Sequence, residues 1–578
     1  MLSRPRMEQN KYKDVLRKLS RTVALVALIS ALINLLMLTG PIYMLQIYDR
    51  VLSSGSVPTL QGLFVIVVVL YTFLGFYQFL RLRLLSRASY RLDKILGPDA
   101  MGFWVYEGLE DTGNFQHQPV RDLSIVRNFV SSPAILGIFD LPWIPIFLVV
   151  VFFIHPWLGY LTVAGAVVVI IAAIMNQLMT QRPAAEAVLL DGADQEFAEI
   201  SRRSAEAVIT LGMKDVVVDR WRQLHEAALA KGQEGSDRTE FFSSFSRSFR
   251  MLLQSTLLTV GAFLALRQEI SPGMIIATSI IASRALAPVD QVIGQWRAIV
   301  RGVGAHRRLQ AAFYAMPPTA NRTSLPDPVG HLEVRSLVKL MPPRSHIKGR
   351  PRILDQVSFK LEPGDGLGVI GNSAAGKSSL ARILVGAWRP EAGDVRLDGA
   401  MLRQWSPEEL GRHIGYLPQS LEMLPGTIAQ NISRFDHTAK DSDVIEAAKL
   451  SGVHEMVLNF PDGYATRIGS HAQPLSSGQI QQIGLARALY RKPKLIVLDE
   501  PNSNLDADGD EAMSVAIRRM REHGSVVIVM AHRPSAIAAV NKLMLMKAGR
   551  VAFFGDKDET IRQATATGPS PRVIEGNG

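Results

Sequence analysis

The stretch GLGVIGNSAAGKSS, residues 366–379, decides the fold of the second half of this 578-residue chain. Its first six residues form an apolar run typical of a buried strand, and the remainder fits the pattern G-x-x-x-x-G-K-[ST] and opens a helical stretch. In such a loop the glycines let the backbone wrap around phosphates, the lysine reaches the β- and γ-phosphates, and the serine can hold Mg²⁺. A chance glycine-rich turn is the alternative. The residues expected to bind nucleotide here are Gly371, Asn372, Ser373, Ala374, Ala375, Gly376, Lys377, Ser378 and Ser379.

A second apolar strand, in KLIVLDEP, ends in two adjacent carboxylates, Asp499 and Glu500. In α/β folds nucleotides bind at the carboxyl ends of the strands, where these side chains emerge. Asp499 suits Mg²⁺ coordination, and Glu500 suits the base that polarises an attacking water. Such a pair alone is more often an ordinary helix start, but the phosphate loop upstream favours the catalytic interpretation.

Two further polar residues terminate apolar strands, Gln419 in HIGYLPQS and His532 in VVIVMAHRPS. Each by itself is typical of an ordinary loop residue. Their order relative to the phosphate loop and the carboxylate pair is what indicates a role.

The stretch PLSSGQIQQIGLARALY, residues 474–490, runs from a small-residue turn directly into a helix. The first backbone N–H groups of that helix have no partner within it, which makes its start a second site for an anion.

The surrounding sequence indicates two domains. The second half alternates short apolar strands with helical stretches, the pattern of an α/β domain with a largely parallel sheet. A proline-rich, polar segment precedes it and marks a boundary. We expect a cytoplasmic N-terminal segment, an all-α transmembrane domain, a linker, an α/β phosphate-loop nucleotide-binding domain and a disordered tail, at residues 1–20, 21–313, 314–330, 331–560 and 561–578.

The first half contains six apolar segments of spanning length. The basic residues that precede the first of them also fit a signal peptide, but no clear cleavage site follows, so we expect a retained span. Lysine and arginine concentrate in two long loops, which places these loops and both termini in the cytoplasm. The predicted spans are residues 22–44, 60–80, 133–154, 157–177, 251–267 and 272–292.

Composition agrees with a membrane protein, since 48% of the residues are hydrophobic. The net charge of +11 also fits nucleic-acid binding, but the basic residues lie beside apolar runs, so we expect a lipid bilayer and no nucleic acid as partner. The chain has no cysteine, which excludes disulfides, thiolate catalysis and cysteine metal sites.

The order of these motifs resembles the nucleotide-binding domain of ABC transporters over residues 332–555. There the phosphate loop, Gln419, the signature LSSGQ, the Asp499–Glu500 strand, the loop SNLD and a switch histidine, His532, stand in the family's order. The resemblance implies ATP and Mg²⁺ as cofactors, with Ser378, Gln419 and Asp499 at the metal and Glu500, His532 and Gln419 in catalysis. It also implies that the signature of one chain caps the ATP of a second, through Ser476 and the N–H of Gly478, and it adds Gln479 and Asp506 to the nucleotide-binding residues.

Three positions depart from the family's pattern. Ser477 replaces the middle glycine of the signature, Met341 or Pro342 stands where an adenine-stacking aromatic is expected, and Ser470 stands where exporters usually have glutamate. These departures concern nucleotide affinity and rate.

The membrane half is similar to type I protein-secretion transporters of the metalloprotease-exporting (PrtD-like) branch, in PIYMLQIYDRV, FDLPWIPIF and RALAPVDQVIGQW. About twenty residues precede the first span, so we expect no N-terminal peptidase domain. The resemblance implies a homodimer in the bacterial inner membrane that works with a periplasmic membrane-fusion adaptor and an outer-membrane channel. Its cargo would be an unfolded protein with a C-terminal signal.

Two charged residues within the spans, Asp140 and Arg284, fit a polar pathway, although an Asp at the interface and an Arg paired for structure are the alternative. Prolines 142, 145 and 288 are expected to kink these helices. An exporter of lipids or small molecules is the rival function. A soluble ATPase of the DNA-repair kind is excluded if the six spans insert.

Overall fold

The computed structural model describes residues 11–109, 118–315, 325–341, 350–469, 474–531 and 537–566. The chain divides into two compact units. Of the described residues, 11–107 and 118–315 belong to the first, and Gly108, Leu109 and the residues from 325 onward belong to the second. The described part of the first unit is helical, and the second combines helices with sheets, as the sequence predicts.

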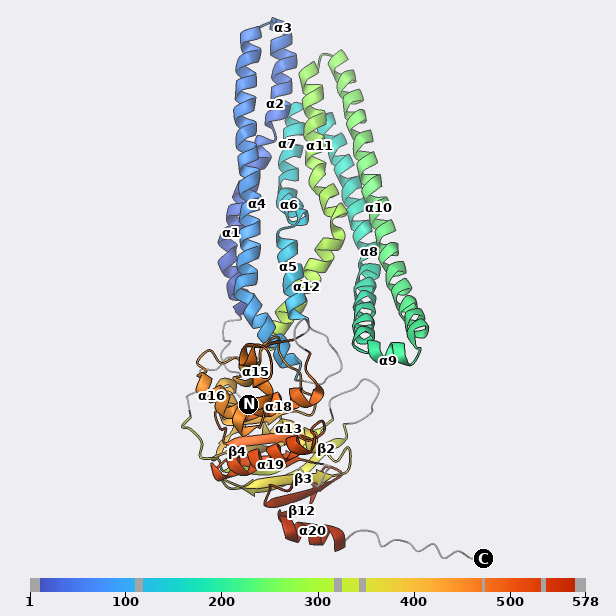
Figure 1. Ribbon diagram of the computed structural model, residues 1–578. Coiled ribbons are helices and arrows are strands. Elements are labelled where there is room, and N and C mark those ends of the chain that lie inside the picture. The colour runs from blue at the N-terminus through green and yellow to red at the C-terminus, as the bar shows by residue number, and fades with distance from the viewer. Residues whose placement is uncertain are drawn as a thin grey trace, which may run out of the picture. The chain divides into compact units, whose positions relative to one another are not determined.

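The first unit consists of long helices joined by short turns (Figure 1). Its elements are α1 (Lys11–Leu36), α2 (Thr39–Gln46), η1 (Ile47–Val51), α3 (Leu52–Ser54), α4 (Val57–Glu107), α5 (Pro119–Val130), α6 (Pro133–Asp140), η2 (Leu141–Trp143), α7 (Ile144–Ile154), α8 (Pro156–Arg203), α9 (Ala205–Thr210), α10 (Lys214–Leu266), α11 (Pro272–Gly294) and α12 (Trp296–Ala315).

In the part of the chain that the structure describes, six helical stretches are long and apolar enough to cross a membrane, which confirms the six predicted spans. Four of them are much longer than the roughly 20 residues that a bilayer requires. The six stretches are Tyr12–Ser54, Val57–Glu107, Pro133–Ile154, Pro156–Arg203, Lys214–Leu266 and Pro272–Gly294.

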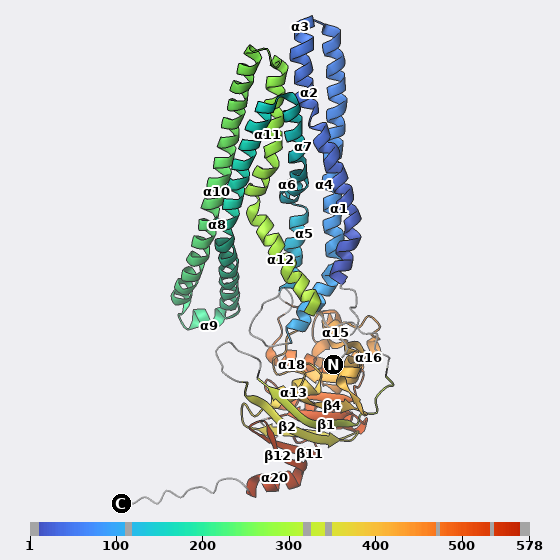
Figure 2. The ribbon, with the colours of Figure 1, turned by 180° about the vertical axis from the view of Figure 1, so that it is seen from behind.

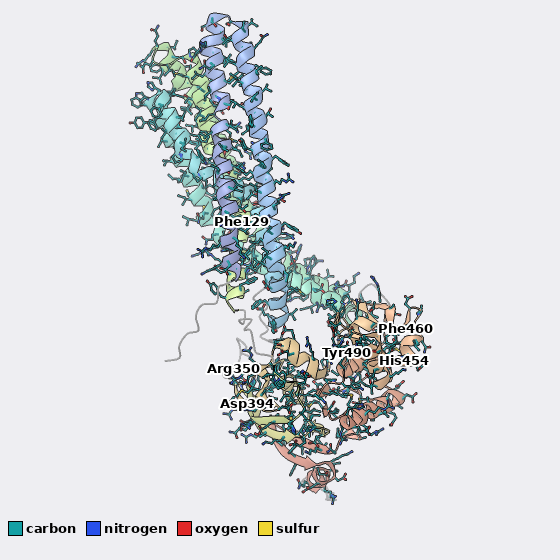
Figure 3. The ribbon with its side chains drawn as sticks, turned by 90° about the vertical axis from the view of Figure 1, so that its left-hand side faces the viewer. Phe129, Arg350, Asp394, His454, Phe460 and Tyr490 are labelled. Atoms are coloured by element: carbon teal, nitrogen blue, oxygen red, sulfur yellow. The ribbon has the colours of Figure 1, made fainter. Side chains whose placement is uncertain are left out.

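Helices α8 and α10 run side by side and, with α9, form an arm that diverges from the other helices of this unit (Figures 1 and 2). Small residues allow close packing: a Cβ on Gly165 of α8 would come within 2.3 Å of Leu253 of α10. Phe129 of α5 lies in the same way against Gly302 of α12, where a Cβ would come within 2.5 Å of the ring (Figure 3).

The stretch PIYMLQIYDRV contacts the start of α11. It contains a π-helical turn, η1, that includes Asp49. The Asp49 carboxylate accepts a hydrogen bond from the backbone N–H of Gly273 at 2.8 Å and another from the hydroxyl of Ser271. Asp49 therefore caps the N-terminus of α11, whose first N–H groups lack partners within the helix.

A buried polar cluster joins α1, α4 and α6. Arg81 forms an ion pair with Asp140 at 2.9 Å, and Asn34 donates to the same carboxylate oxygen at 2.9 Å. Arg81 also donates to Ser30 at 3.2 Å. In the single chain Asp140 therefore has a cation from a neighbouring helix as its partner, and its place on a polar pathway stays a prediction.

The third span is interrupted at the predicted proline. Residues Leu141–Trp143 form a 3₁₀ turn, η2, between α6 and α7, with Pro142 at its centre. Helix α11 instead continues past Pro288 to Gly294. Arg284 is exposed on α11 in the single chain, so it is not buried in a structural pair there.

The described residues of the second unit form three sheets and their covering helices. Its strands are β1 (Leu332–Leu340), β2 (Arg352–Leu361), β3 (Gly366–Gly371), β4 (Ala392–Leu397), β5 (Ala400–Met401), β6 (Ile414–Leu417), β7 (Gly426–Thr427), β8 (Arg467–Ile468), β9 (Leu495–Asp499), β10 (Val526–Met530), β11 (Lys542–Lys547) and β12 (Arg550–Asp556). Its helices are α13 (Lys377–Leu384), η3 (Leu402–Gln404), α14 (Pro407–His413), α15 (Ile428–Ile432), α16 (Asp441–Leu450), α17 (His454–Leu458), η4 (Gly463–Ala465), α18 (Ser477–Leu489), α19 (Ala507–Glu522) and α20 (Lys557–Ala566).

The largest sheet has the order β12-β11-β3-β10-β9-β6 and is parallel except for its edge strand β12. Its central strands β9 and β10 are buried throughout, as the continuous apolar runs predict. An antiparallel sheet, β2-β1-β4-β5, shares one hydrophobic core with it and with α13. The carboxyl ends of β3, β9 and β6 consequently lie along one edge.

A separate hydrophobic cluster lies among α15 to α18. Tyr490 belongs to it and Phe460 packs against it, and both lie with His454 on the same side of the unit (Figure 3). At the C-terminus, the disordered tail expected from residue 561 is wrong for its first residues, because α20 continues to Ala566. The buried side chain of Thr560 anchors this helix beside β11 and β12.

Candidate nucleotide site

The phosphate loop connects β3 to α13 and depends on two glycines. Gly371 has φ +158°, and a Cβ there would come within 2.4 Å of the Met546 carbonyl oxygen. Gly376 has φ +96°, and its Cβ would come within 2.9 Å of the Ile353 carbonyl oxygen. The loop can close tightly only without these side chains, which is the shape that a phosphate cradle requires.

Lys377 begins α13 and is buried beneath the loop. Its ammonium group donates to the carbonyl oxygens of Gly371 at 2.8 Å and Asn372 at 3.3 Å. Burial lowers the pKa of Lys377, while the nearby charges of Glu500 and Asp499 act in the opposite direction. The cation is thus held at the centre of the loop by carbonyl oxygens that a phosphate can replace.

Asp499 lies at the end of β9, next to the first turn of α13. Ser378 donates to its Oδ1 at 3.2 Å. Burial raises the pKa of Asp499, and the hydrogen bond from Ser378 partly offsets that effect. A buried carboxylate beside a hydroxyl, with Lys377 nearby, is a donor set that fits Mg²⁺ accompanied by phosphate oxygens.

Glu500 follows Asp499 in a left-handed conformation, with φ +51°. Its backbone N–H donates to the Met530 carbonyl at 3.0 Å, which holds this conformation at the sheet edge. Gln419, after β6, donates from Nε2 to Oε2 of Glu500 at 3.1 Å. A residue strained in this way and aimed by a neighbour is typical of functional sites.

The structure thus connects Ser378 with Asp499 and Gln419 with Glu500, although about 80 to 120 residues separate the members of each pair. Lys377 completes this group. Asn372, Ser373 and Ala374 are exposed along the loop, whereas Ala375 is buried and Ser379 partly buried. His532, Pro342 and Ser470 lie outside the described residues. Met341 is described, and its N–H donates to the Pro351 carbonyl at 2.9 Å.

The signature begins α18 with a reciprocal cap. The Ser476 hydroxyl accepts from the N–H of Gln479 at 3.2 Å, and the Gln479 side chain accepts from the N–H of Ser476 at 2.9 Å. Gly478 lies close to the next loop, since a Cβ there would come within 3.0 Å of the Asn504 carbonyl oxygen. Ser477 is exposed.

Two residues near the signature differ from the sequence-based prediction: Gln481 was not predicted to have a role, and Asp506 was predicted to have a different one. Gln481 of α18 donates to the Glu500 carbonyl at 3.2 Å and accepts from the N–H of Asn504 at 3.2 Å. It ties the signature helix to the strand end that carries the carboxylates, and only its position two residues after the motif LSSGQ hinted at a role. Asp506, expected at the nucleotide, caps α19 by accepting from the N–H of Gly509 at 2.8 Å.

Comparison with known proteins identifies both units. The family described as ABC transporter matches residues 354–503, and the ABC transporter transmembrane region matches residues 23–287. The type I secretion system ATP-binding protein PrsD of Rhizobium meliloti is 41% identical over 93% of this chain and 92% of its own length. The chain is a type I secretion ABC transporter. It hydrolyses ATP to drive transport in protein secretion, and it is a multi-pass protein of the inner membrane.

Other relatives of this secretion transporter are more distant. The exotoxin translocation ATP-binding protein PaxB of Pasteurella aerogenes is 26% identical over 93% of the chain and 75% of its own length. The alpha-hemolysin translocation ATP-binding protein HlyB of Escherichia coli O157:H7 is 25% identical over 94% and 77%. The solved structure of a bacterial Atm1-family ABC exporter with ATP bound matches with a TM-score of 0.78 at 20% identity, over 96% of this chain and 99% of that one. It supports the exporter fold alone.

Proposed function

We propose that this transporter is the motor of a type I secretion system and exports an unfolded polypeptide whose signal lies at its C-terminus. One observation carries the proposal: the 41% identity to a type I secretion protein extends over both the membrane unit and the nucleotide unit. The pathway as well as the motor therefore resembles that of a protein exporter.

In the motor, we assign binding of the ATP phosphates to the loop from Gly371 to Ser379, with Lys377 as the cation that neutralises them. Ser378 and Asp499, with Gln419, would hold Mg²⁺, which supplies further neutralisation of phosphate charge. Glu500 accepts the proton of the attacking water, and Gln419 holds the Glu500 carboxylate in place. His532 is the proposed switch residue.

Each complete site requires two chains in this proposal. The start of α18 offers unpaired N–H groups and a favourable helix dipole to an anion, as does the phosphate loop. Among the described residues, the hydrogen bonds of Ser476 and Gln479 stay within the cap of α18 and do not reach the loop. We infer that Ser476, Gly478, Gln479 and Asp506 of one protomer complete the nucleotide site of its partner in a homodimer.

A crosslinking experiment tests this arrangement. The chain contains no cysteine, so Ser373→Cys and Ser477→Cys introduce single thiols at two exposed positions. When the two single-cysteine chains are mixed and ATP is added, we expect a crosslinked product of dimer size on a denaturing gel. Chains that carry Ser373→Cys alone serve as the control and should crosslink far less. A double-cysteine chain that yields only an internal crosslink of monomer size would contradict the composite site.

We place the nucleotide-binding domain, proposed at residues 331–560, in the cytoplasm and the transmembrane domain, proposed at 21–313, in the bilayer. The basic residues of the long extensions of α4, α8 and α10 support this orientation. On the opposite side a periplasmic membrane-fusion adaptor and an outer-membrane channel would continue the path of the cargo.

A signal at the C-terminus of the cargo predicts that the ATPase rate responds to cargo only when that segment is present. The intact cognate protein, kept unfolded, should change the ATPase rate of the purified transporter, and the same protein without its C-terminal segment should leave the basal rate unchanged. The reason is that a ligand shifts a conformational equilibrium only through contacts that distinguish its states. Removal of an N-terminal segment of equal length is the control. Equal responses to the intact and C-terminally truncated cargo would refute the assignment, and a response to lipid alone would favour a lipid exporter.

A further inference from the structure

A cavity of about 220 Å³ lies within the helical unit, between the interrupted third span, α8 and the junction of α11 with α12. Eight of its eleven lining side chains are aliphatic, including Leu141, Ile170 and Val289. An engineered cavity of about 150 Å³ with similar lining binds benzene, so this space is large enough for part of an apolar ligand.

Two polar groups in the lining have no partner among the described residues. Asn176 is fully buried, and its Nδ2 makes no hydrogen bond, whereas its Oδ1 accepts from the Thr180 hydroxyl at 3.1 Å. The indole Nε1 of Trp296 is also buried and unpaired. The remaining polar lining residue, Gln177, is exposed. Since buried N–H groups normally have acceptors, a mostly aliphatic cavity with two such groups fits a ligand with a carbonyl oxygen.

The depth of these two N–H donors in the bilayer limits the class of ligand that can reach them. Asn176 lies twenty residues beyond Pro156, the start of α8, which corresponds to about 30 Å of helix and to the thickness of the hydrocarbon core. Trp296 lies a comparable distance from Pro272, the start of α11. Leu141, Ile170 and Val289 lie closer to mid-span. The donors are therefore at the level of the lipid ester groups, and the apolar lining extends from them toward the bilayer centre.

The side chains at the opening of the cavity also favour a lipid ligand. Ile170 and Ile174, which line it, are exposed on α8, and their neighbours Ile171, Met175 and Leu178 are exposed as well. An apolar, exposed face of a spanning helix normally contacts lipid. In the single chain this apolar face gives an acyl chain a route from the bilayer to the cavity.

We propose that this cavity binds an acyl chain of a membrane phospholipid, whose ester carbonyl accepts hydrogen bonds from Asn176 and Trp296. One carbonyl oxygen has two lone pairs and can serve both donors. The lipid stays bound beside the interrupted third span and is not cargo. The proposal requires only that the helices cross a bilayer, so it does not rest on the identity of the secreted substrate.

Photolabelling of the full-length transporter in lipid nanodiscs tests the site. The probe is a diacyl phosphatidylethanolamine with a diazirine on its acyl chain, and labelled peptides are mapped by mass spectrometry. We expect label on residues 170–177 and 289–296. Ala173→Phe, which fills the cavity, should reduce that label about fivefold or more, whereas Ala164→Phe, at an exposed position of the same helix, should not. Unchanged label in Ala173→Phe, or a crosslink between these peptides and a second copy in place of lipid, would overturn the proposal.

A competition on the unsubstituted protein tests the hydrogen bonds and does not depend on a variant that folds. Unlabelled diester phosphatidylethanolamine should compete about fivefold better than its dialkyl ether analogue, because the ether lacks the carbonyl acceptor. Trp296→Phe should reduce this preference for the diester lipid. Trp157→Phe, which changes an exposed tryptophan at the start of α8, should preserve it. Equal competition by the two lipids would overturn the assignment of the ester carbonyl.

Discussion

Glu500→Gln should bind ATP as the unsubstituted transporter does and hydrolyse it at least about 100-fold more slowly, since a positioned general base contributes on that order. The amide keeps the size of the side chain and can still pair with Gln419, which lies 3.1 Å from the carboxylate. The site should therefore keep its shape and lose only the proton acceptor. Steady-state ATPase rates and binding of a fluorescent ATP analogue, measured on one preparation, check both halves of this expectation.

Two further substitutions test whether the loss of hydrolysis is specific to Glu500. Glu511→Gln removes an exposed carboxylate of α19 that pairs with Arg518, and it should leave hydrolysis unchanged. Lys377→Ala should instead weaken ATP binding itself, because it removes the cation held inside the phosphate loop. Turnover at the normal rate in Glu500→Gln would show that another group accepts the proton.

Removal of either member of the Arg81–Asp140 pair should be the most destabilising change in the helical unit. Arg81→Leu leaves a largely buried carboxylate, whose side chain is 13% exposed, without its cation, and loss of one partner of a buried pair costs about 3–5 kcal/mol. Asp140→Leu leaves the buried Arg81 guanidinium without its carboxylate partner. The double variant Arg81→Leu/Asp140→Leu should recover most of the loss, since no charge remains buried. Thermal unfolding of the purified transporter in detergent measures all three.

Arg222→Ala is the matched control for this cycle. Arg222 pairs with Asp219 at 2.8 Å, but both side chains are more than half exposed, so removal should cost less than about 1 kcal/mol. If the double variant were as unstable as the sum of the two single variants, the pair would not be coupled, and the structural role assigned to it would be wrong.

The arrangement of the nucleotide unit was predictable because its motifs are local. A phosphate loop, a strand that ends in carboxylates and a capped helix each occupy one short stretch, and the length of an apolar run and the turn residues beside it distinguish a buried strand from a helix. The tail was predicted less well: the residues after 560 are mostly small or polar, but α20 continues to Ala566, and the buried side chain of Thr560 belongs to this helix. The roles of the site residues, and the second chain that completes the site, stay predictions.

The six spans, the two-unit organisation and the phosphate loop were predictable from the amino-acid sequence, because helix length, apolar runs and glycine spacing are properties of contiguous residues. Only the tertiary structure decided which distant groups meet. Asp49 caps α11 more than 200 residues away, Arg81 neutralises Asp140, and Gln481 joins the signature helix to the strand end of Glu500. Each of these is a polar side chain removed from water, so its energy depends on the partner that packing brings to it, and no local pattern names that partner.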